Sequence, residues 1–315
     1  MSDDEEGVVR DIVTPRAMKD YGLGLVNYRK NRIKRSTDST NVRRFVSHFG
    51  STPRVLSVIY ADLQSTSIAD ARVTGTKLNL RHFLIAMHTL KQYPTEEERQ
   101  AIFDISPHHG RDVVWFYLEK IQNLKTAKIK WPSDEECKGN VWIMSVDGTH
   151  CWIEEPIHPE FSQDTAFYSH KYNKAGVNYE LGILLWESRL VWMKGPTRAG
   201  SNDITNFATG GLEEKLLLMG KKAIGDNGYS GHQVTISTPN GADPRNVAKF
   251  KSRALKRHEK FNGMAKSFDC LQGRFRHSVA RFAICFEAVC VICQYQLENG
   301  KPLYNILIED IMGEN

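Results

Sequence analysis

The sequence lacks the apolar N-terminal region of a secretory signal. It begins MSDDEEG, which is acidic, so secretion is not expected. It also lacks a hydrophobic run long enough to cross a membrane. The most apolar stretch, residues 282–297, contains Glu287 and falls short of the roughly 20 residues that a span needs. We therefore expect a buried core helix in this stretch and no membrane association.

Cysteine is scarce, with six in 315 residues, which excludes a disulfide framework and fits a reducing compartment. Cys290 and Cys293 have C-x-x-C spacing, but no second pair of ligands lies nearby in the sequence. Packed core thiols are therefore favoured over a zinc or redox site. No aromatic RNA-binding motif is present. The net charge of +5 permits nucleic-acid binding without requiring it.

The N-terminal part of the chain changes character near residue 41. Residues 1–40 are polar and charged, which predicts a mobile tail, and YRKNRIKRS (28–36) is a dense basic cluster. This cluster is a nuclear-localisation signal, a DNA-backbone patch or a solvated charge run. Apolar residues at three- and four-residue steps predict helices over 41–130. Within them, TEEE predicts a capping box. The helix that it opens, the turn DISPHHG and the helix RDVVWFYLEKIQNLK form a helix-turn-helix candidate, with a plain helical bundle as the alternative.

Strand-like segments begin after KIKWPSDEECKGN, a stretch rich in charge, Pro and Gly. VWIMSVDG, CWIEEP, YELGILLWE and RLVWMKG are short, aromatic and β-branched. A helix over about 203–219, a strand ending at Asp226, the strand TISTP and helices over about 244–270 and 275–298 follow. This order predicts an α/β domain over 131–315, with helices flanking a mixed sheet.

Two of these strands end in an acid, Asp147 and Asp226. A carboxylate at the end of a buried strand costs free energy unless it is paired, hydrogen-bonded or bound to a cation. A third acid, Glu259, lies in a basic helical segment, where it shares one face with Asn262 and Lys266. Three carboxylates from separate elements form a minimal site for two Mg²⁺ (or Mn²⁺) ions, which prefer oxygen ligands. Such a pair of ions promotes phosphodiester cleavage.

Each acid also has a simpler interpretation. Asp147 alone is typical of a strand end, and Asp226 before Asn-Gly is typical of a turn. Glu259 among lysines and arginines is typical of a surface helix partner. Asp203 lies where a helix should begin, so an N-cap is favoured over an auxiliary acidic role.

The motifs SVDGTH, GSNDITNF, AIGDNGY and RHEKFNGMAK, in this order, resemble those of PIF/Harbinger-type DDE transposases. The resemblance covers about residues 128–315 and implies an RNase H-like catalytic domain. The first two aspartates of the family fall on Asp147 and Asp226. Its glutamate and the lysine that follows fall on Glu259 and Lys266.

The resemblance implies that Asp147, Asp226 and Glu259 are catalytic and hold the metal ions, with Thr149 and His150 as auxiliary residues. It implies cleavage of double-stranded DNA at transposon ends and joining to a target, in the nucleus, by a homo-oligomer. It also makes a Myb-like accessory protein a candidate partner. The family usually has an aliphatic residue before the glutamate and Arg-x-Phe-Gly after it, and a histidine before the acid at the helix start; neither departure removes a predicted metal ligand.

Two basic groups are predicted to contact DNA phosphates. The first contains Arg29, Lys30, Arg32, Lys34 and Arg35, and the second contains Arg253, Lys256, Arg257 and Lys266. We expect the first group to dock DNA and the second to lie beside the metal ions. Two alternatives to a transposase remain at this stage. One is a domesticated, catalytically silent, transposase-derived DNA-binding protein, and the other is an RNase H-like nuclease that acts on other nucleic acids.

Overall fold

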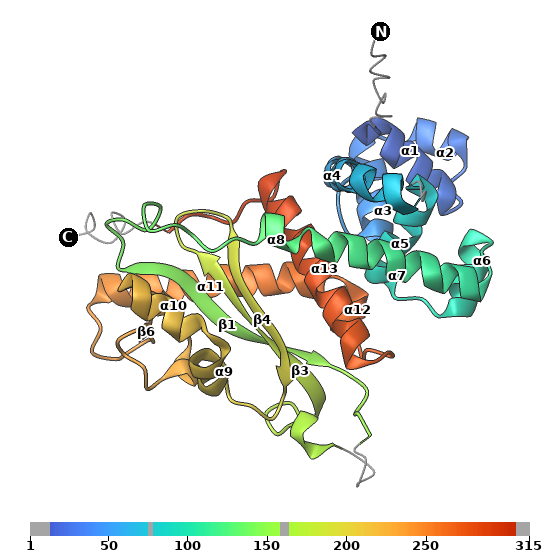
Figure 1. Ribbon diagram of the computed structural model, residues 1–315. Helices are drawn as coiled ribbons and strands as arrows, with labels where there is room; N and C mark the ends of the chain where they lie inside the picture. The colour runs from blue at the N-terminus through green and yellow to red at the C-terminus, as the bar shows by residue number, and fades with distance from the viewer. Residues whose placement is uncertain (1–12, 75–77, 158–163, 307–315) are drawn as a thin grey trace, which may run out of the picture. The chain divides into compact units, whose positions relative to one another are not determined.

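The computed structural model describes residues 13–74, 78–157 and 164–306, and the chain divides into two compact units (Figure 1). Unit 1 comprises Met1–His88 and Pro94–Val114. Unit 2 comprises Thr89–Tyr93 and Trp115–Asn315.

Unit 1 is helical in the part of it that is described. Its elements are α1 (Pro15–Leu25), α2 (Lys30–Arg35), α3 (Asp38–Phe49), α4 (Pro53–Thr74), most of α5 (Leu80–Gln92), α6 (Glu96–Phe103) and the start of α7 (Pro107–Asn123). Thr95 and Glu98 form the predicted capping box, because the Thr95 Oγ1 accepts from Glu98 N at 3.2 Å and Thr95 N donates to Glu98 Oε2 at 2.7 Å. This confirms the start of α6. That α6 and α7 act as a helix-turn-helix remains a prediction.

The prediction that residues 1–40 form a mobile tail is wrong for the described part of that segment, which lacks the first twelve residues. Met18 and Leu23 of α1 are fully buried. Gly22 lies so close to Phe45 of α3 that a Cβ at Gly22 would be 2.5 Å from the ring. The buried residues of α1, Met18, Gly22 and Leu23, lie on one helical face and are enough to anchor the helix. In the sequence this short apolar pattern is hidden among charged neighbours.

Unit 2 is built on a mixed sheet, which confirms the predicted α/β class. Its strands are β1 (Trp142–Trp152), β2 (Tyr168–Ser169), β3 (Lys174–Leu184), β4 (Leu190–Arg198), β5 (Lys222–Ile224) and β6 (Ile236–Ser237). The order across the sheet is β4-β3-β1-β5-β6, and β2 pairs with the start of β3. The pairs β4–β3 and β3–β1 are antiparallel, whereas β1–β5 and β5–β6 are parallel.

The two strands predicted over 141–148 and 151–156 are one strand, β1. β3 holds it together, because antiparallel pairing continues from Met144 to Trp152. Asp147 is therefore in the middle of β1 and not at its end. The parallel pairing with β5 does stop earlier, with Ser145 opposite Ile224. Asp147 thus lies just beyond the end of the parallel pair.

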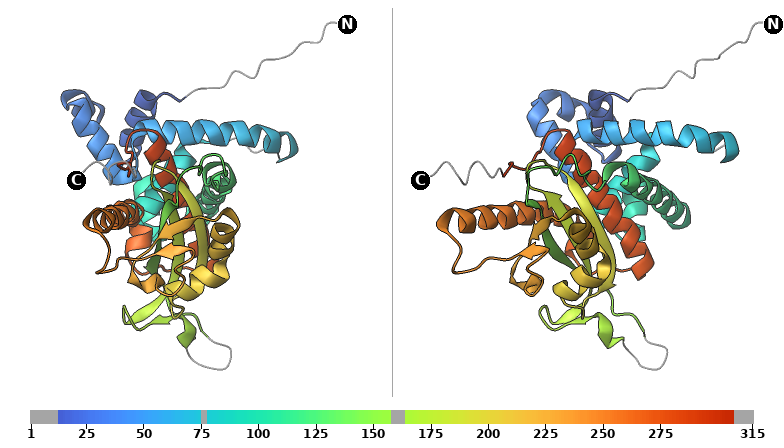
Figure 2. Two further views of the ribbon diagram at one scale, coloured as in Figure 1. Left: turned by 90° about the vertical axis from the view of Figure 1, so that its left-hand side faces the viewer. Right: turned by 60° about the vertical axis from the view of Figure 1, so that its left-hand side comes forward.

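Helices cover both faces of the sheet (Figure 2). They are α8 (Lys125–Lys128), α9 (Asp203–Gly210), α10 (Leu212–Met219), α11 (Arg245–Lys266), α12 (Asp269–Gln272) and α13 (Val279–Glu298), with short 3₁₀ turns η1 (Thr165–Phe167) and η2 (Asn227–Tyr229). Met144 and Val146 of β1 share a core with Phe207 of α9. Ser145 points to the other face, where its hydroxyl lies 3.0 Å from Nδ1 of His258 on α11. Side chains of β1 therefore alternate between α9 and α11.

The predicted helix over 203–219 is two helices. Gly211 separates α9 from α10 with a φ of 95°, a backbone conformation that favours glycine.

The apolar helix α13 is buried as predicted. By length and composition it passes as a membrane span within the described residues, but 72% of its apolar window is buried inside the protein. Cys290 and Cys293 are fully buried free thiols. A core helix explains both observations.

Candidate active site

Asp147 and Asp226 come together at the end of the β1–β5 pair. Ser145 is opposite Ile224; Asp147 follows two residues after Ser145 on β1, and Asp226 follows two residues after Ile224, just beyond the end of β5. Adjacent strands are about 4.8 Å apart, so the register sets the two carboxylates beside each other. Asp226 is the N-cap of η2, and its Oδ1 accepts from Gly228 N at 2.9 Å. The turn interpretation of Asp226 is therefore correct and is compatible with a functional role for Oδ2.

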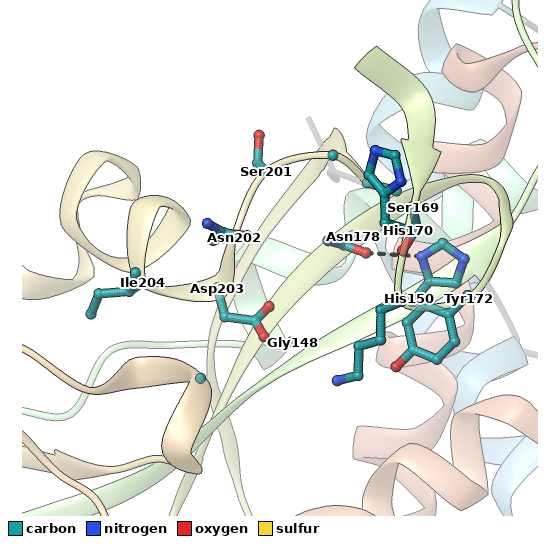
Figure 3. Close-up of a pocket in the computed structure, with 14 residues that line it drawn as sticks. Gly148, His150, Ser169, His170, Tyr172, Asn178, Ser201, Asn202, Asp203 and Ile204 are labelled. Atoms are coloured by element: carbon teal, nitrogen blue, oxygen red, sulfur yellow. Dashed lines mark hydrogen bonds between the residues drawn. The ribbon is translucent and has the colours of Figure 1, made fainter. Parts of the chain in front are cut away.

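Asp203 joins this pair from α9. A Cβ at Gly148 would be 2.3 Å from its Oδ1, and a Cβ at Gly228 would be 3.1 Å from its Oδ2. Figure 3 shows the Asp203 carboxylate directed at Gly148. The N-cap interpretation of Asp203 is wrong, because Asn202 is the N-cap and Asp203 is the first residue of the helix. The two glycines leave the space that the carboxylate fills.

The three aspartates repel one another. Burial, then Asp226 and Asp203, raise the pKa of Asp147 to about 7. Burial and then Asp226 also raise the pKa of Asp203. The negative charges of these carboxylates therefore act on one another, and Lys171 offsets them in part.

Asn262 on α11 holds Asp147 in place. Its Nδ2 donates to Asp147 Oδ2 at 2.9 Å, and its Oδ1 accepts from the Thr149 hydroxyl at 2.8 Å. The predicted auxiliary residue Thr149 therefore acts through Asn262. The sequence placed Asn262 on the face of Glu259 but assigned it no partner.

Lys171, in the loop after β2, interacts electrostatically with all three aspartates. Tyr172 is the largest cause of its raised pKa, and Asp203 and Asp226 raise it further. No motif marks Lys171 in the sequence. Lys266 is half-buried on α11 and lies near His150, whose pKa is lowered first by burial and then, in part, by this lysine. The two lysines flank the site on different elements.

A fourth acid, Glu180 of β3, lies within electrostatic range of Asp203. It is 4% exposed, and its Oε1 accepts from Trp192 Nε1 at 2.8 Å, while Oε2 has no hydrogen-bond partner in the described structure. Burial, with a smaller contribution from Asp203, raises the pKa of Glu180 to about 7. The hydrogen bond from Trp192 acts in the opposite direction and lowers this pKa. The buried hydroxyl of Tyr229 also has no partner there. Alternation of β3 could have identified Glu180 as an inward-facing residue.

The side chain of Glu259 points away from the three aspartates. It is exposed and lines a hollow with Asn240 and Lys256. It is not among the charges that shift the pKa of Asp147 or Asp203. On α11 it lies between His258, which contacts Ser145, and Asn262, so its backbone runs beside β1. Its predicted catalytic role remains a prediction.

Arg257 is fully buried, so it is not available to bind phosphate as predicted. Its Nε donates to the Tyr304 carbonyl at 2.6 Å, its Nη2 to the Glu187 carbonyl at 2.6 Å, and its Nη1 to the Leu184 carbonyl. Burial lowers its pKa to about 10. The side chain therefore ties α11 to the end of β3. The neighbouring Arg253 lies with its guanidinium 5.9 Å from the ring centre of Tyr304.

Arg257→Ala should lower the free energy of unfolding by about 3 kcal/mol, because three backbone carbonyls, of which the Leu184 carbonyl is buried, lose a charged donor. Lys256→Ala, on the adjacent exposed position, should change it by less than about 0.5 kcal/mol. Urea unfolding of both variants measures the difference. Equal stabilities would contradict a structural role for Arg257.

The predicted N-terminal basic group lies on and beside α2 in unit 1. Arg29, Lys30, Arg32, Lys34 and Arg35 are all exposed. Four of them border a hollow of about 550 Å³. A contact with DNA phosphates is sterically open, and it remains a prediction.

The donor set suits a hard divalent cation, which takes carboxylate and amide oxygens. Asp147, Asp203 and Asp226 supply such oxygens, and their mutual repulsion is what a cation would relieve. Within the described ranges, no group of three or more His, Cys, Asp or Glu side chains is arranged so that it could hold a metal ion. The aspartates are therefore gathered without being fully converged.

Residues 146–294, just under half of the chain, match the family model described as a DDE superfamily endonuclease. The matched segment begins one residue before Asp147 and includes Asp203, Asp226 and Glu259. It supports the superfamily assignment and a transposase-like nuclease domain. No curated protein and no solved structure matches the chain.

Proposed function

We propose that the protein is a PIF/Harbinger-type transposase that cleaves double-stranded DNA at transposon ends and joins it to a target. The observation that carries this proposal is the joining of Asp147 and Asp226 at the end of the parallel strands, inside the segment that resembles DDE endonucleases. In this proposal Glu259 is the third catalytic carboxylate. A nuclear location, a homo-oligomer and a Myb-like partner belong to the same proposal.

An RNase H-like domain accounts for the sheet. Three antiparallel strands, β4, β3 and β1, are followed by two parallel strands that α9, α10 and η2 connect. A ligand site at the carboxyl end of parallel strands is common in α/β proteins, and Asp147 and Asp226 occupy that edge. In this proposal α6 and α7 act as a helix-turn-helix and add DNA contacts.

Asp147, Asp226 and Glu259 would hold two Mg²⁺ or Mn²⁺ ions, with Asp203 in an auxiliary role. When bound, such ions stabilise negative charge on the phosphate and make water or a 3′-hydroxyl a better nucleophile. Asn262 fixes the orientation of Asp147. Lys171 and Lys266 offer ammonium groups to the phosphate, which hold it in line with the carboxylates.

The test is cleavage of a supercoiled plasmid that carries the genomic flanks of the coding sequence. The wild-type protein should nick this DNA only with Mg²⁺ or Mn²⁺, and should leave an RNA–DNA hybrid of the same sequence uncut. DNA binding without cleavage under every divalent ion would favour the domesticated DNA-binding protein. Preferred cleavage of the hybrid would favour a nuclease for other nucleic acids.

Alanine substitution of all five basic residues at positions 29–35 should weaken DNA binding equally for all sequences. Each lost phosphate contact should reduce the slope of log K against log salt by about 0.9, because fewer counterions are released. The single-turnover rate on saturating DNA should not change. A salt titration by fluorescence anisotropy measures the slope. An unchanged slope would leave the cluster as a localisation signal only.

A further inference from the structure

A cavity of about 400 Å³ opens beside the acidic cluster of unit 2. Gly148 and Asp203 border it at one end, and His150 and Tyr172 border it at the other (Figure 3). Its volume lies in the range of small-molecule sites. The cavity therefore runs from the carboxylates to a pair of rings.

The two rings form a stacking surface. His150 and Tyr172 are stacked, with their centres 4.4 Å apart and an angle of 19° between their planes. Tyr172 is nevertheless 45% exposed. An exposed aromatic ring that is held by a second ring loses little conformational entropy when a flat ligand stacks on it. Such a surface suits a planar ligand.

Hydrogen bonding and packing fix the orientation of the His150 ring. Its Nδ1 lies 3.2 Å from Asn178 Oδ1, so Nδ1 carries the proton in the tautomer that this contact favours. Its Nε2 is buried and has no hydrogen-bond partner among the described residues. Burial lowers the pKa of His150, which keeps the ring neutral. This edge of the ring packs on Gly176 of β3 and is closed to the cavity, so His150 serves as a neutral, fixed ring that supports Tyr172.

Lys171 connects the rings to the acids. Its Nζ lies 5.4 Å from the ring centre of Tyr172, and Asp203 and Asp226 contribute to its raised pKa after Tyr172. A ligand that places a phosphate at the carboxylates and a flat ring at Tyr172 would contact the acids, Lys171 and the Tyr172 ring together. A nucleotide has this shape, but a base stacked inside a duplex cannot reach the ring.

We propose that the cavity holds one nucleobase that has left the DNA stack next to the cleaved phosphate, with the base stacked on Tyr172. This inference rests on the proposed function, since it names a subsite for the same DNA substrate. Stacking on an aromatic ring accepts any base, so this subsite should tolerate all four bases.

The test compares single-turnover cleavage by three variants. The DNA is a duplex centred on the cleavage position mapped in the wild-type assay. Tyr172→Ala should slow cleavage about 10- to 100-fold, because the unstacked base loses its platform. Tyr172→Phe keeps the ring and should stay within about threefold of wild type. The control Tyr21→Ala, a tyrosine of unit 1 that is also 45% exposed, should cut at the wild-type rate.

An abasic site at the nucleotide next to the cut separates stacking from a general loss of structure. With no base to move, Tyr172→Ala should cut this duplex at nearly the rate of the wild-type protein. A rate for Tyr172→Ala equal to wild type on intact DNA, or equal slowing on intact and abasic DNA, would overturn the pocket proposal and leave the proposed function standing. Absence of cleavage by the wild-type protein would overturn both.

Discussion

Asp226→Asn should reduce divalent-dependent DNA cleavage at least about 1,000-fold while leaving DNA affinity unchanged. The amide keeps the size of the side chain and the hydrogen bond from Gly228 N to Oδ1, so η2 should stay folded. What it removes is the negative charge opposite Asp147. Asp147→Asn should have the same effect on cleavage. A matched control is Glu214→Gln on α10, an exposed carboxylate outside the site, which should cut normally.

Single-turnover cleavage and anisotropy on the same DNA measure the two effects separately. Cleavage by Asp226→Asn at the parent rate would contradict the mechanism. Loss of binding together with cleavage would place Asp226 in DNA docking instead.

The same substitution at Asp147 should stabilise the metal-free protein at high pH. The folded-state pKa of Asp147 is about 7, above its ordinary value of 3.8. Its contribution to stability is fully present below about pH 4 and is lost as the pH rises through 7, when the folded protein must give up the proton. Asp147→Asn should therefore raise the melting temperature at pH 8 by roughly 2–6 °C, and by little at pH 5. Thermal melts in EDTA at both values test this, and a larger gain at pH 5 would contradict it.

Glu259→Gln should also lower cleavage at least about 1,000-fold, and Asp203→Asn should lower it only about 10- to 100-fold. Asp147 faces α11, where Asn262 holds it, and Glu259 lies on that helix one turn earlier. Asp203 reaches the cluster from the opposite face of the sheet, beside Gly148. Glu259 lies on the same side of the sheet as Asp147, so its carboxylate is the better third ligand. The exposed Glu259 side chain has no described partner from which it would have to move away.

Cleavage by both variants, compared with the Glu214→Gln control, decides between the two acids. The reverse ranking would make Asp203 the third carboxylate and Glu259 a surface residue. DNA affinity should be equal in all three variants.

The sequence predicted the elements whose signals are local. The capping box of α6, the buried helix α13 and the α/β order follow from spacing within one segment. The mistakes arose where partners are distant in the chain. Asp147 looks like a strand end because its neighbour Gly148 is a turn former, whereas β3 continues the pairing.

The basic pattern of α11 shows the same limit for side chains. Phe250, Ala254, Phe261 and Ala265 form a buried stripe at three-, four- and seven-residue steps, and Arg257 lies on it. The stripe was present in the sequence, but the carbonyls that Arg257 binds come from β3 and from the segments that follow β3 and α13. Lys171 and Glu180 were missed for a similar reason, since only the folded sheet brings them to Asp203.

A crystal of the protein grown with Mn²⁺, examined by anomalous scattering, tests the central claim most directly. The proposed mechanism predicts manganese peaks within about 2.0–2.4 Å of carboxylate oxygens of both Asp147 and Asp226, with Glu259 or Asp203 completing the site. Peaks only at other residues, or none at Asp147 and Asp226 at millimolar Mn²⁺, would contradict the account.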